Sequence, residues 1–193
     1  MAFPSPPWHL NGQLWGSLIR ATPPGGQVGT YLTAFVSYEA PGTLSYSELL
    51  VARRAEDAGR SLTVRDIWAD SAASVEGGRA LWSMPKHLAD FSREGGGLGL
   101  VGRDTWSVAV DGAGIASAQF ADVSRLALRL PFRGSAQQPR ITGGTVVARL
   151  RGSGKALPCL AHWTFEAGGP LGWLATKQPL VSFRIRDFAL DLH

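Results

Sequence analysis

Apolar and polar residues alternate along much of this chain with a period of two, which is the period of half-buried β-strands. In the tail, Val181, Phe183 and Ile185 share one face, while Ser182 and Arg184 fall on the other. Clusters of Gly, Pro or Ser separate such stretches. The pattern predicts strands over 14–20, 30–38, 44–54, 61–69, 98–103, 105–111, 114–121, 124–132, 144–152, 155–166 and 180–191.

One segment has a different period. Its apolar residues recur at helical spacing, and Asp70 before it is a residue type that commonly caps helix N-termini, so we predict a helix over 71–82. The adjacent Gly77 and Gly78 weaken this helix by roughly 1 kcal/mol each relative to alanine. The pair indicates that another part of the molecule packs closely there. Pro85 prevents the helix from continuing.

The segment that follows the helix, residues 82–91, is predicted to be extended. Side chains alternate in such a segment, so one side carries Trp82, Met84, Lys86 and Leu88. Burial among apolar groups would lower the pKa of the lysine, and a neutral amine can form a Schiff base with a carbonyl compound. The alternative is a snorkelling lysine, whose stem covers apolar surface while its charge stays in water.

A carboxylate occupies a comparable position in residues 44–52. One face of this predicted strand carries Leu44, Tyr46, Glu48, Leu50 and Ala52. A partly buried glutamate near a lysine could tune it, orient a water molecule or act as acid or base. Because the opposite face also contains apolar residues, an exposed glutamate on a strand surface remains the alternative.

The composition favours one domain over residues 1–193, because 45% of the residues are hydrophobic and no linker divides the chain. The 24 glycines and 12 prolines indicate a turn-rich, mainly β protein. No apolar run is long enough for a transmembrane helix, and MAFPSPPWHL lacks the features of a secretory signal. Cys159 is the single cysteine and cannot form an internal disulfide. Together these features predict a cytoplasmic protein with no membrane partner.

Charge and histidine content narrow the function classes further. The net charge is +4, but the sixteen arginines are spread along the chain, so we expect solvated arginines on strand faces and no nucleic-acid partner. The four histidines, His9, His87, His162 and His193, lack the spacing of metal ligands. We expect no metal and no organic cofactor.

Residues 70–86, DSAASVEGGRALWSMPK, resemble the signature of the acetoacetate decarboxylase superfamily. Asp70, Gly78-Arg79 and Pro85-Lys86 fall in register without a gap, and the upstream LSYSELL resembles the aromatic-x-Glu segment of that family. The resemblance implies that Lys86 is the Schiff-base lysine and that Glu48 is an active-site carboxylate. It also implies a mainly β fold, a closed antiparallel β-barrel with one or few short helices, which is usually part of a homo-oligomer.

The implied activity is that of a decarboxylase-type lyase acting on a small oxo acid or ketone. Two alternatives are an aldolase or dehydratase that uses the same lysine, and a non-catalytic barrel that binds an apolar ligand. The expected substrate-binding residues are Trp82, Met84, Arg79 and Tyr46, although Arg79 could instead pair with Glu76 and the apolar residues could be ordinary core.

The sequence departs from the decarboxylase pattern at three places. His87 stands where the decarboxylase has a second lysine, and the stretch HLNGQLW lacks the arginine of the N-terminal strand. A second carboxylate of the family aligns near Thr33. By strand alternation, His87 is expected to point away from the apolar face, so burial would have to cause most of the change in the pKa of Lys86. Without the arginine, the pocket could favour a larger and less polar substrate.

Overall fold

The described part of the chain consists mainly of strands, which confirms the predicted mainly β fold. A computed structural model describes residues 3–55, 61–96, 102–122, 126–140 and 143–193. Its elements in chain order are β1 (Trp8–Ala21), β2 (Gly29–Glu39), β3 (Tyr46–Arg54), β4 (Ser61–Ala69), α1 (Ala72–Trp82), β5 (Lys86–Leu88), β6 (Asp90–Gly96), β7 (Arg103–Val110), β8 (Ala113–Asp122), β9 (Leu128–Pro139), β10 (Thr145–Phe165), the short 3-10 helix η1 (Gly172–Leu174) and β11 (Pro179–Leu192).

Most strand predictions match these elements, and two fall partly on residues that the structure does not describe. The strand predicted over 98–103 lies almost wholly outside the described residues, and β7 begins at Arg103. The strand predicted over 124–132 begins outside them, and its described part belongs to β9.

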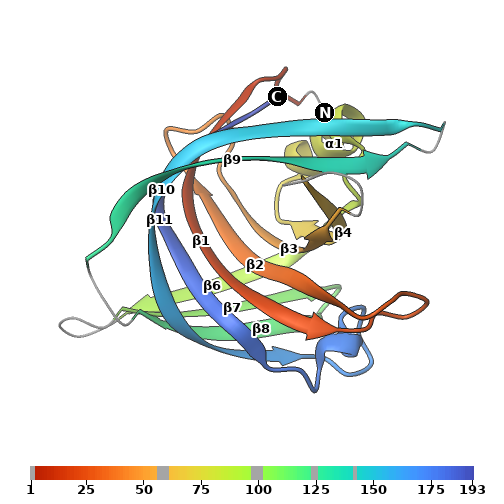
Figure 1. The fold of residues 1–193 in the computed structure, drawn as a ribbon, viewed down its shortest axis with the longest axis vertical. Helices are drawn as coiled ribbons and strands as arrows, with labels where there is room; N and C mark the ends of the chain where they lie inside the picture. The colour runs from red at the N-terminus through yellow and green to blue at the C-terminus, as the bar shows by residue number, and fades with distance from the viewer. Residues whose placement is uncertain (1–2, 56–60, 97–101, 123–125, 141–142) are drawn as a thin grey trace.

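The strands pair into a ring with a smaller sheet below it (Figure 1). Among the described strands, the pairing runs β11-β1-β2-β3-β4-β9-β10, and β10 pairs with β11 again. The C-terminal half of the long strand β10 leaves the ring and pairs with β8, which continues through β7 to β6. The pairing is antiparallel except where β4 meets β5 and β9, so it is not antiparallel throughout.

Strands β1 to β4 are covered on both faces. On β3, Glu48 and Ala52 line the interior of the ring, while Leu49 and Val51 belong to a second core between the ring and the smaller sheet. The second core contains stacked aromatic rings: the ring of Phe35 on β2 stacks on the rings of Trp106 and Trp163. A strand that is buried on both faces explains why apolar residues occupy both parities of the β3 sequence.

The helix begins at Ala72, one residue later than predicted. Ser71 is the N-cap, and its hydroxyl accepts a hydrogen bond from the backbone N–H of Ser74 at 3.3 Å. Asp70 instead accepts from the backbone N–H of Ser47 at 2.7 Å and so ties the start of the helix to β3. The prediction of Asp70 as the cap was therefore wrong, because a neighbouring strand uses its carboxylate.

The close packing predicted at the glycine pair is confirmed. A Cβ added to Gly77 would lie 2.6 Å from the ring of Trp8, and one added to Gly78 would lie 2.9 Å from Cδ of Lys86. The helix ends at Trp82, and Ser83 adopts a left-handed conformation with φ 51°. The chain then turns into β5, so the extended segment predicted over 82–91 begins later than expected.

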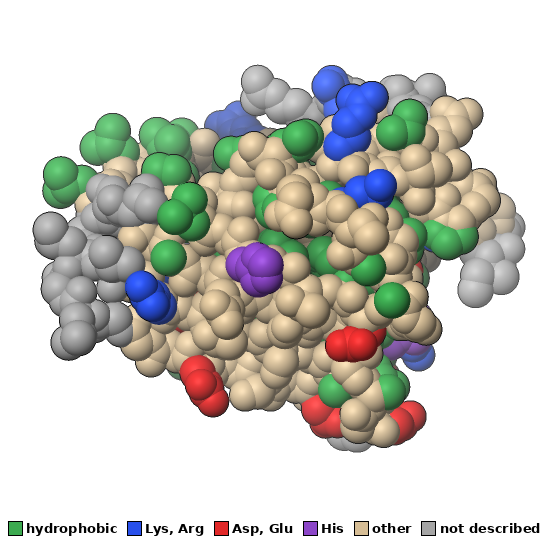
Figure 2. Space-filling model, turned by 90° about the horizontal axis from the view of Figure 1, so that it is seen from below, with side chains coloured by type: hydrophobic (Ala, Val, Ile, Leu, Met, Phe, Trp, Pro, Cys, Tyr) green, Lys and Arg blue, Asp and Glu red, His purple; other side chains and the backbone are tan. Residues whose placement is uncertain are grey.

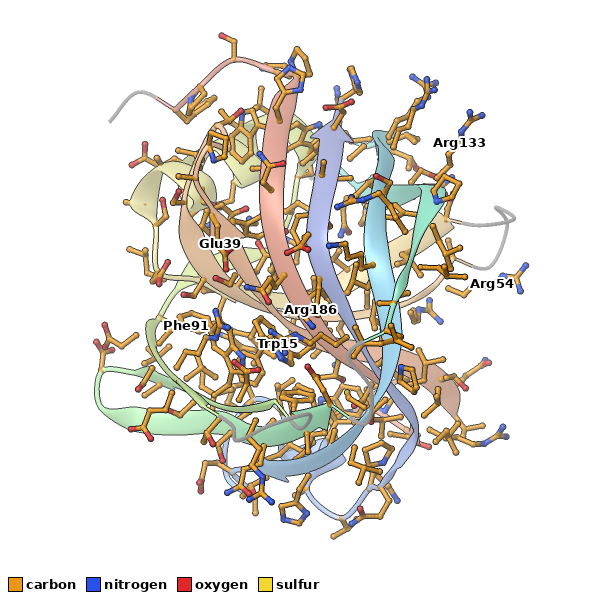
Figure 3. All side chains as sticks on the ribbon, turned by 90° about the vertical axis from the view of Figure 1, so that its left-hand side faces the viewer. Trp15, Glu39, Arg54, Phe91, Arg133 and Arg186 are labelled. Atoms are coloured by element: carbon orange, nitrogen blue, oxygen red, sulfur yellow. The ribbon has the colours of Figure 1, made fainter. Side chains whose placement is uncertain are left out.

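The arginines follow two patterns. Arg54 and Arg133 point away from the ring (Figure 3). Arg184 does not follow the expectation of solvated arginines, because its side chain is 9% exposed and pairs with two aspartates. On β11 the polar Ser182 is also buried, and on the apolar face Val181 is half exposed while Ile185 lines the interior of the ring, so both faces of the tail are partly covered.

The outer surface gives two further facts. Charged side chains lie mostly toward the margins of the face seen from below, and hydrophobic side chains gather toward one corner of it (Figure 2). Within the described ranges, no helix is both long and apolar enough to cross a membrane.

Candidate active site

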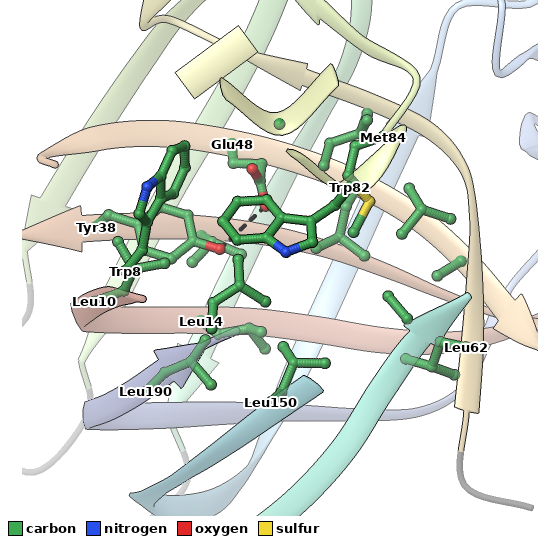
Figure 4. A pocket seen from close by; sticks show the side chains of 18 of the residues that line it. Trp8, Leu10, Leu14, Tyr38, Glu48, Leu62, Trp82, Met84, Leu150 and Leu190 are labelled. Carbon is green, nitrogen blue, oxygen red and sulfur yellow. Dashed lines mark hydrogen bonds between the residues drawn. The ribbon is translucent and has the colours of Figure 1, made fainter. Parts of the chain in front are cut away.

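The interior of the ring contains a cavity of about 250 Å³ that is lined almost entirely by apolar side chains (Figure 4). Of its 25 lining residues, the ones that carry a hydroxyl, carboxylate or ammonium group are Tyr38, Tyr46, Glu48, Lys86 and Ser135. Four of these five form one connected cluster. The cavity therefore has one polar corner and otherwise apolar walls.

Lys86 is the centre of the polar cluster. It begins β5, where it is the register partner of Ile67 on β4. Its ammonium donates to Oε2 of Glu48 at 2.6 Å, to Oγ of Ser74 at 2.8 Å and to Oη of Tyr46 at 3.4 Å. The side chains of Lys86 and Glu48 are only 6% and 4% exposed. A buried charge pair with further hydrogen bonds is the arrangement in which both ions persist away from water.

The charge state of Lys86 differs from the prediction. Burial does act to lower its pKa, but the charge of Glu48, the charge of Tyr46 and hydrogen bonds to both act in the opposite direction. The net result is that the pKa of Lys86 is raised from its ordinary value. The expectation of a lowered pKa was wrong, because the interactions with Glu48 and Tyr46 together outweigh burial. Lys86 rests as an ammonium ion and must lose a proton before it can act as a nucleophile.

Two tyrosines complete the polar corner. Oη of Tyr38 donates to Oε1 of Glu48 at 3.2 Å, and the rings of Tyr38 and Tyr46 stack with their centroids 4.3 Å apart. Burial, followed by the charge of Glu48, raises the pKa of Tyr38 well above its ordinary value. Burial also raises the pKa of Tyr46. Both phenols stay protonated near neutral pH and can donate hydrogen bonds.

The structure brings five of the six predicted site residues to this cavity. Lys86, Glu48, Tyr46, Trp82 and Met84 all line it. Met84 and Lys86 point inward as strand alternation predicted, and Trp82 reaches the cavity from the end of the helix. Within the same segment Leu88 is 53% exposed, so its predicted place on the apolar side was wrong.

Arg79 lies elsewhere. It is exposed and does not line the cavity, and its Nε donates to the backbone carbonyl of Lys86 at 2.6 Å. We therefore correct the expected contact with a ligand to a positioning role, in which Arg79 ties the end of α1 to the lysine's backbone.

Sequence reasoning missed Ser74 and Tyr38. Ser74 lies four residues before Gly78, so helical periodicity places both on the helix face that meets Lys86. Tyr38 is the register partner of Tyr46 in the β2–β3 pair. Each could have been found from spacing once the helix and the hairpin had been accepted.

The three departures from the decarboxylase pattern can be located relative to the cavity. None of the described residues that line the cavity is an arginine. His87 is exposed and lines a separate open cleft with Asp66 and Trp68, as its parity predicted. Thr33 is fully buried but does not line the cavity. Among the described residues, no group of three or more His, Cys, Asp or Glu side chains is placed to hold a metal ion.

Comparison with known proteins identifies structures that share this fold. No family model and no curated protein matches the sequence. The enduracididine biosynthesis enzyme MppR, solved with pyruvate, superposes with a TM-score of 0.68 at 19% identity over 99% of this chain and 90% of its own. Acetoacetate decarboxylase from Legionella pneumophila gives 0.66 at 14% identity, covering 100% and 87%. An acetoacetate decarboxylase-like enzyme from Sphingomonas wittichii gives 0.66 at 12%, covering 96% and 89%. The chain therefore has the acetoacetate decarboxylase-like fold.

Proposed function

We propose that this protein is a Schiff-base enzyme in which Lys86 forms an imine with the carbonyl group of a small oxo acid or ketone. The observation that carries the proposal is a single buried amine, hydrogen-bonded to a carboxylate at 2.6 Å, in the polar corner of an otherwise apolar cavity. Its solved structural neighbours are enzymes, and one of them was solved with the oxo acid pyruvate.

Glu48 supplies the proton transfers in this proposal. As the carbonyl compound enters, the proton of the Lys86 ammonium moves to Glu48, and the neutral amine attacks the carbonyl carbon. The attacking nitrogen gives one proton to the carbonyl oxygen to form a carbinolamine, Glu48 returns the other proton to this hydroxyl group, and the oxygen leaves as water. The product is an iminium ion paired with the glutamate, so the charge balance of the cavity is the same as before the reaction. Tyr38 and Tyr46 donate hydrogen bonds and orient the groups.

The iminium is an electron sink for more than one reaction. With a 3-oxo acid, the C–C bond to the carboxylate breaks, CO2 leaves and the electron pair of that bond forms an enamine; this decarboxylase-type reaction is the leading expectation from the sequence. With a hydroxylated carbonyl compound, the same iminium supports aldol cleavage, aldol addition or loss of water. Each of these reactions requires the amine of Lys86.

A non-catalytic barrel that binds an apolar ligand is the second candidate. It is favoured by the ion pair itself, because a lysine held permanently as an ammonium by Glu48 would be a structural element. The homo-oligomer and the cytoplasmic location stay predictions.

The test is reduction with borohydride in the presence of a panel of oxo acids and ketones, followed by intact mass and peptide mapping. The proposal expects a reduced adduct on Lys86 and none in the Lys86→Ala variant. Lys155→Ala is the matched control, because Lys155 is a partly exposed lysine that also pairs with a carboxylate, that of Asp187. No adduct on Lys86 across the panel would favour the binding protein.

A further inference from the structure

The cavity walls beyond the polar corner are the strongest unexplained feature of the molecule. The lining contains one cationic side chain, Lys86, and one anionic side chain, Glu48, and these two neutralise each other at 2.6 Å. Tyr38 and Tyr46 lie at the same corner, and Ser135, whose hydroxyl is hydrogen-bonded to Ser61, carries the remaining hydroxyl of the lining. Among the described residues that line the cavity, Lys86 is therefore the one cation, and it is already paired with Glu48.

We propose that the substrate of this site is an uncharged aldehyde or ketone with an apolar chain or ring, and that oxo acids are poor substrates. This inference rests on the proposed imine chemistry of Lys86. A substrate carboxylate would enter mainly apolar walls whose one described cation is a lysine that is already paired, and Glu48 would repel it. An alkyl or aryl group in the same place loses only its contact with water, which favours binding.

The shape of the cavity indicates where the apolar part lies. Lys86 is the register partner of Ile67, and Leu62 lies five residues earlier on the same strand, which places Leu62 roughly 16 Å along the strand from the lysine. Figure 4 shows Leu62 on the side of the cavity opposite Tyr38 and Glu48. A volume of about 250 Å³ lies near the lower end of the roughly 300–1,000 Å³ that is typical of small-molecule sites, so the cavity suits a small carbonyl compound.

The uncharged substrate also selects among the reactions of the iminium. A carbonyl compound without a carboxylate has no CO2 to lose. Its iminium can instead lose a proton from the adjacent carbon to form an enamine, which adds to a second carbonyl, or it can break the C–C bond of a hydroxylated chain. Glu48 is the base within reach for either proton. Aldol-type or dehydration chemistry is therefore the reaction class that fits an uncharged substrate.

Borohydride trapping with three probes of equal non-hydrogen atom number tests the substrate class. The probes are methyl hexyl ketone, the keto acid γ-acetylbutyrate, which cannot readily lose CO2, and its uncharged amide, γ-acetylbutyramide. We expect the ketone to label Lys86 about tenfold or more faster than the keto acid, with the amide in between. Equal labelling by the keto acid would overturn this inference while leaving the imine chemistry intact. No labelling of Lys86 by any probe would overturn the proposed function itself.

A chain-length series locates the apolar part of the substrate. In the wild-type protein, labelling should rise from acetone through methyl propyl ketone to methyl hexyl ketone. Leu62→Phe fills the far side of the cavity and should move the best substrate to a shorter chain. Leu128→Phe is the matched control, because Leu128 is 79% exposed and does not line the cavity. An unchanged chain-length preference in Leu62→Phe would contradict the proposed direction of the chain.

Discussion

Two regions of this molecule bury charged side chains, and they use them differently. In the ring interior, Lys86 and Glu48 pair at the edge of a cavity. Between the ring and the smaller sheet, Arg184 pairs with Asp104 and Asp122 at 3.1 and 2.6 Å. Arg93 also pairs with Asp104 at 3.0 Å. No residue of this second cluster lines the apolar cavity.

The packing around each cluster explains the difference. The guanidinium groups of Arg93 and Arg184 lie 4.3 and 4.6 Å from the ring centroid of Trp15, whose indole N–H donates to Asp104. Trp15 lies where the ring meets the smaller sheet (Figure 3). The second cluster is thus filled by an aromatic side chain, whereas the first borders empty space. We expect the tightly packed charge cluster to stabilise the fold, whereas the charge pair that borders the cavity can contact a ligand.

Loss of the lysine should produce the largest functional effect. Lys86→Ala should abolish borohydride-trapped adducts, because Lys86 is the one amine among the described residues of the cavity lining. Lys86→Arg should be equally inactive, since a guanidinium stays charged at neutral pH. Intact mass after trapping with methyl hexyl ketone measures both. Adducts that persist unchanged in Lys86→Ala would show that Lys86 is not the reactive amine and that its ion pair has no chemical role distinct from that of the Arg184 cluster.

Loss of the arginine should affect stability and leave the chemistry intact. Arg184→Met leaves Asp122 buried without its cation, while Asp104 keeps Arg93, so we expect a loss of about 3–5 kcal/mol in the free energy of unfolding. That corresponds to a fall of roughly 6–20 °C in Tm by calorimetry. Adduct formation on Lys86 in the folded fraction should be unchanged. If Arg184→Met does not fold, Arg184→Lys should show a smaller loss of the same kind.

The ion pair of the active site can be tested in the same way. Lys86→Met leaves Glu48 buried without its partner and should destabilise the fold by about 3–5 kcal/mol. The double variant Lys86→Met with Glu48→Leu removes both charges and should recover most of that loss. Urea denaturation of the three proteins measures the coupling. A double variant that is less stable than the single one would mean that Glu48 has a stabilising role apart from Lys86.

Glu48→Gln should shift the pH dependence of trapping. The pKa of Lys86 is raised because Glu48 and Tyr46 together outweigh burial, so removing the charge of Glu48 should let burial lower it. The rise of the trapping rate with pH should therefore move to lower pH, and the maximum rate should fall because the proton acceptor is lost. Glu94→Gln changes an exposed glutamate and is the control. An unshifted profile would contradict the account of the pKa.

The smallest expected effect concerns the glycine pair. Gly78→Ala would bring a Cβ to 2.9 Å from Cδ of Lys86, so it should displace the lysine and slow trapping, while the helix propensity of alanine offsets part of the packing cost. In Gly77→Ala the added Cβ would instead lie 2.6 Å from the ring of Trp8. This variant should have a lower Tm, with a smaller effect on the trapping rate of the folded protein. Identical effects of the two substitutions would show that helix stability alone is involved.

The sequence allowed prediction of local features. Alternation placed Tyr46 and Glu48 on one face of β3, and it placed Met84 and Lys86 toward the same cavity. The resemblance to acetoacetate decarboxylase indicated the fold that the structure shows. These features depend on spacing within one element or on a motif without gaps.

Features that depend on distant partners could not be predicted. The burial of Arg184 requires Asp122, which lies 62 residues away in the chain. Asp70 was expected to cap the helix, but the structure pairs its carboxylate with the backbone of Ser47. The pKa of Lys86 depends on a contact with Glu48 across 38 residues, and alternation gives the burial of each group but not their distance.

The most direct test of imine formation is exchange of the carbonyl oxygen of methyl hexyl ketone with water enriched in heavy oxygen. Each cycle of imine formation and hydrolysis replaces that oxygen, so the exchange reports the chemistry without knowledge of the natural substrate. We predict exchange well above the buffer rate with the wild-type protein and with Lys155→Ala, and none above it with Lys86→Met. Exchange at the buffer rate with the wild-type protein, or equal exchange with Lys86→Met, would contradict the account.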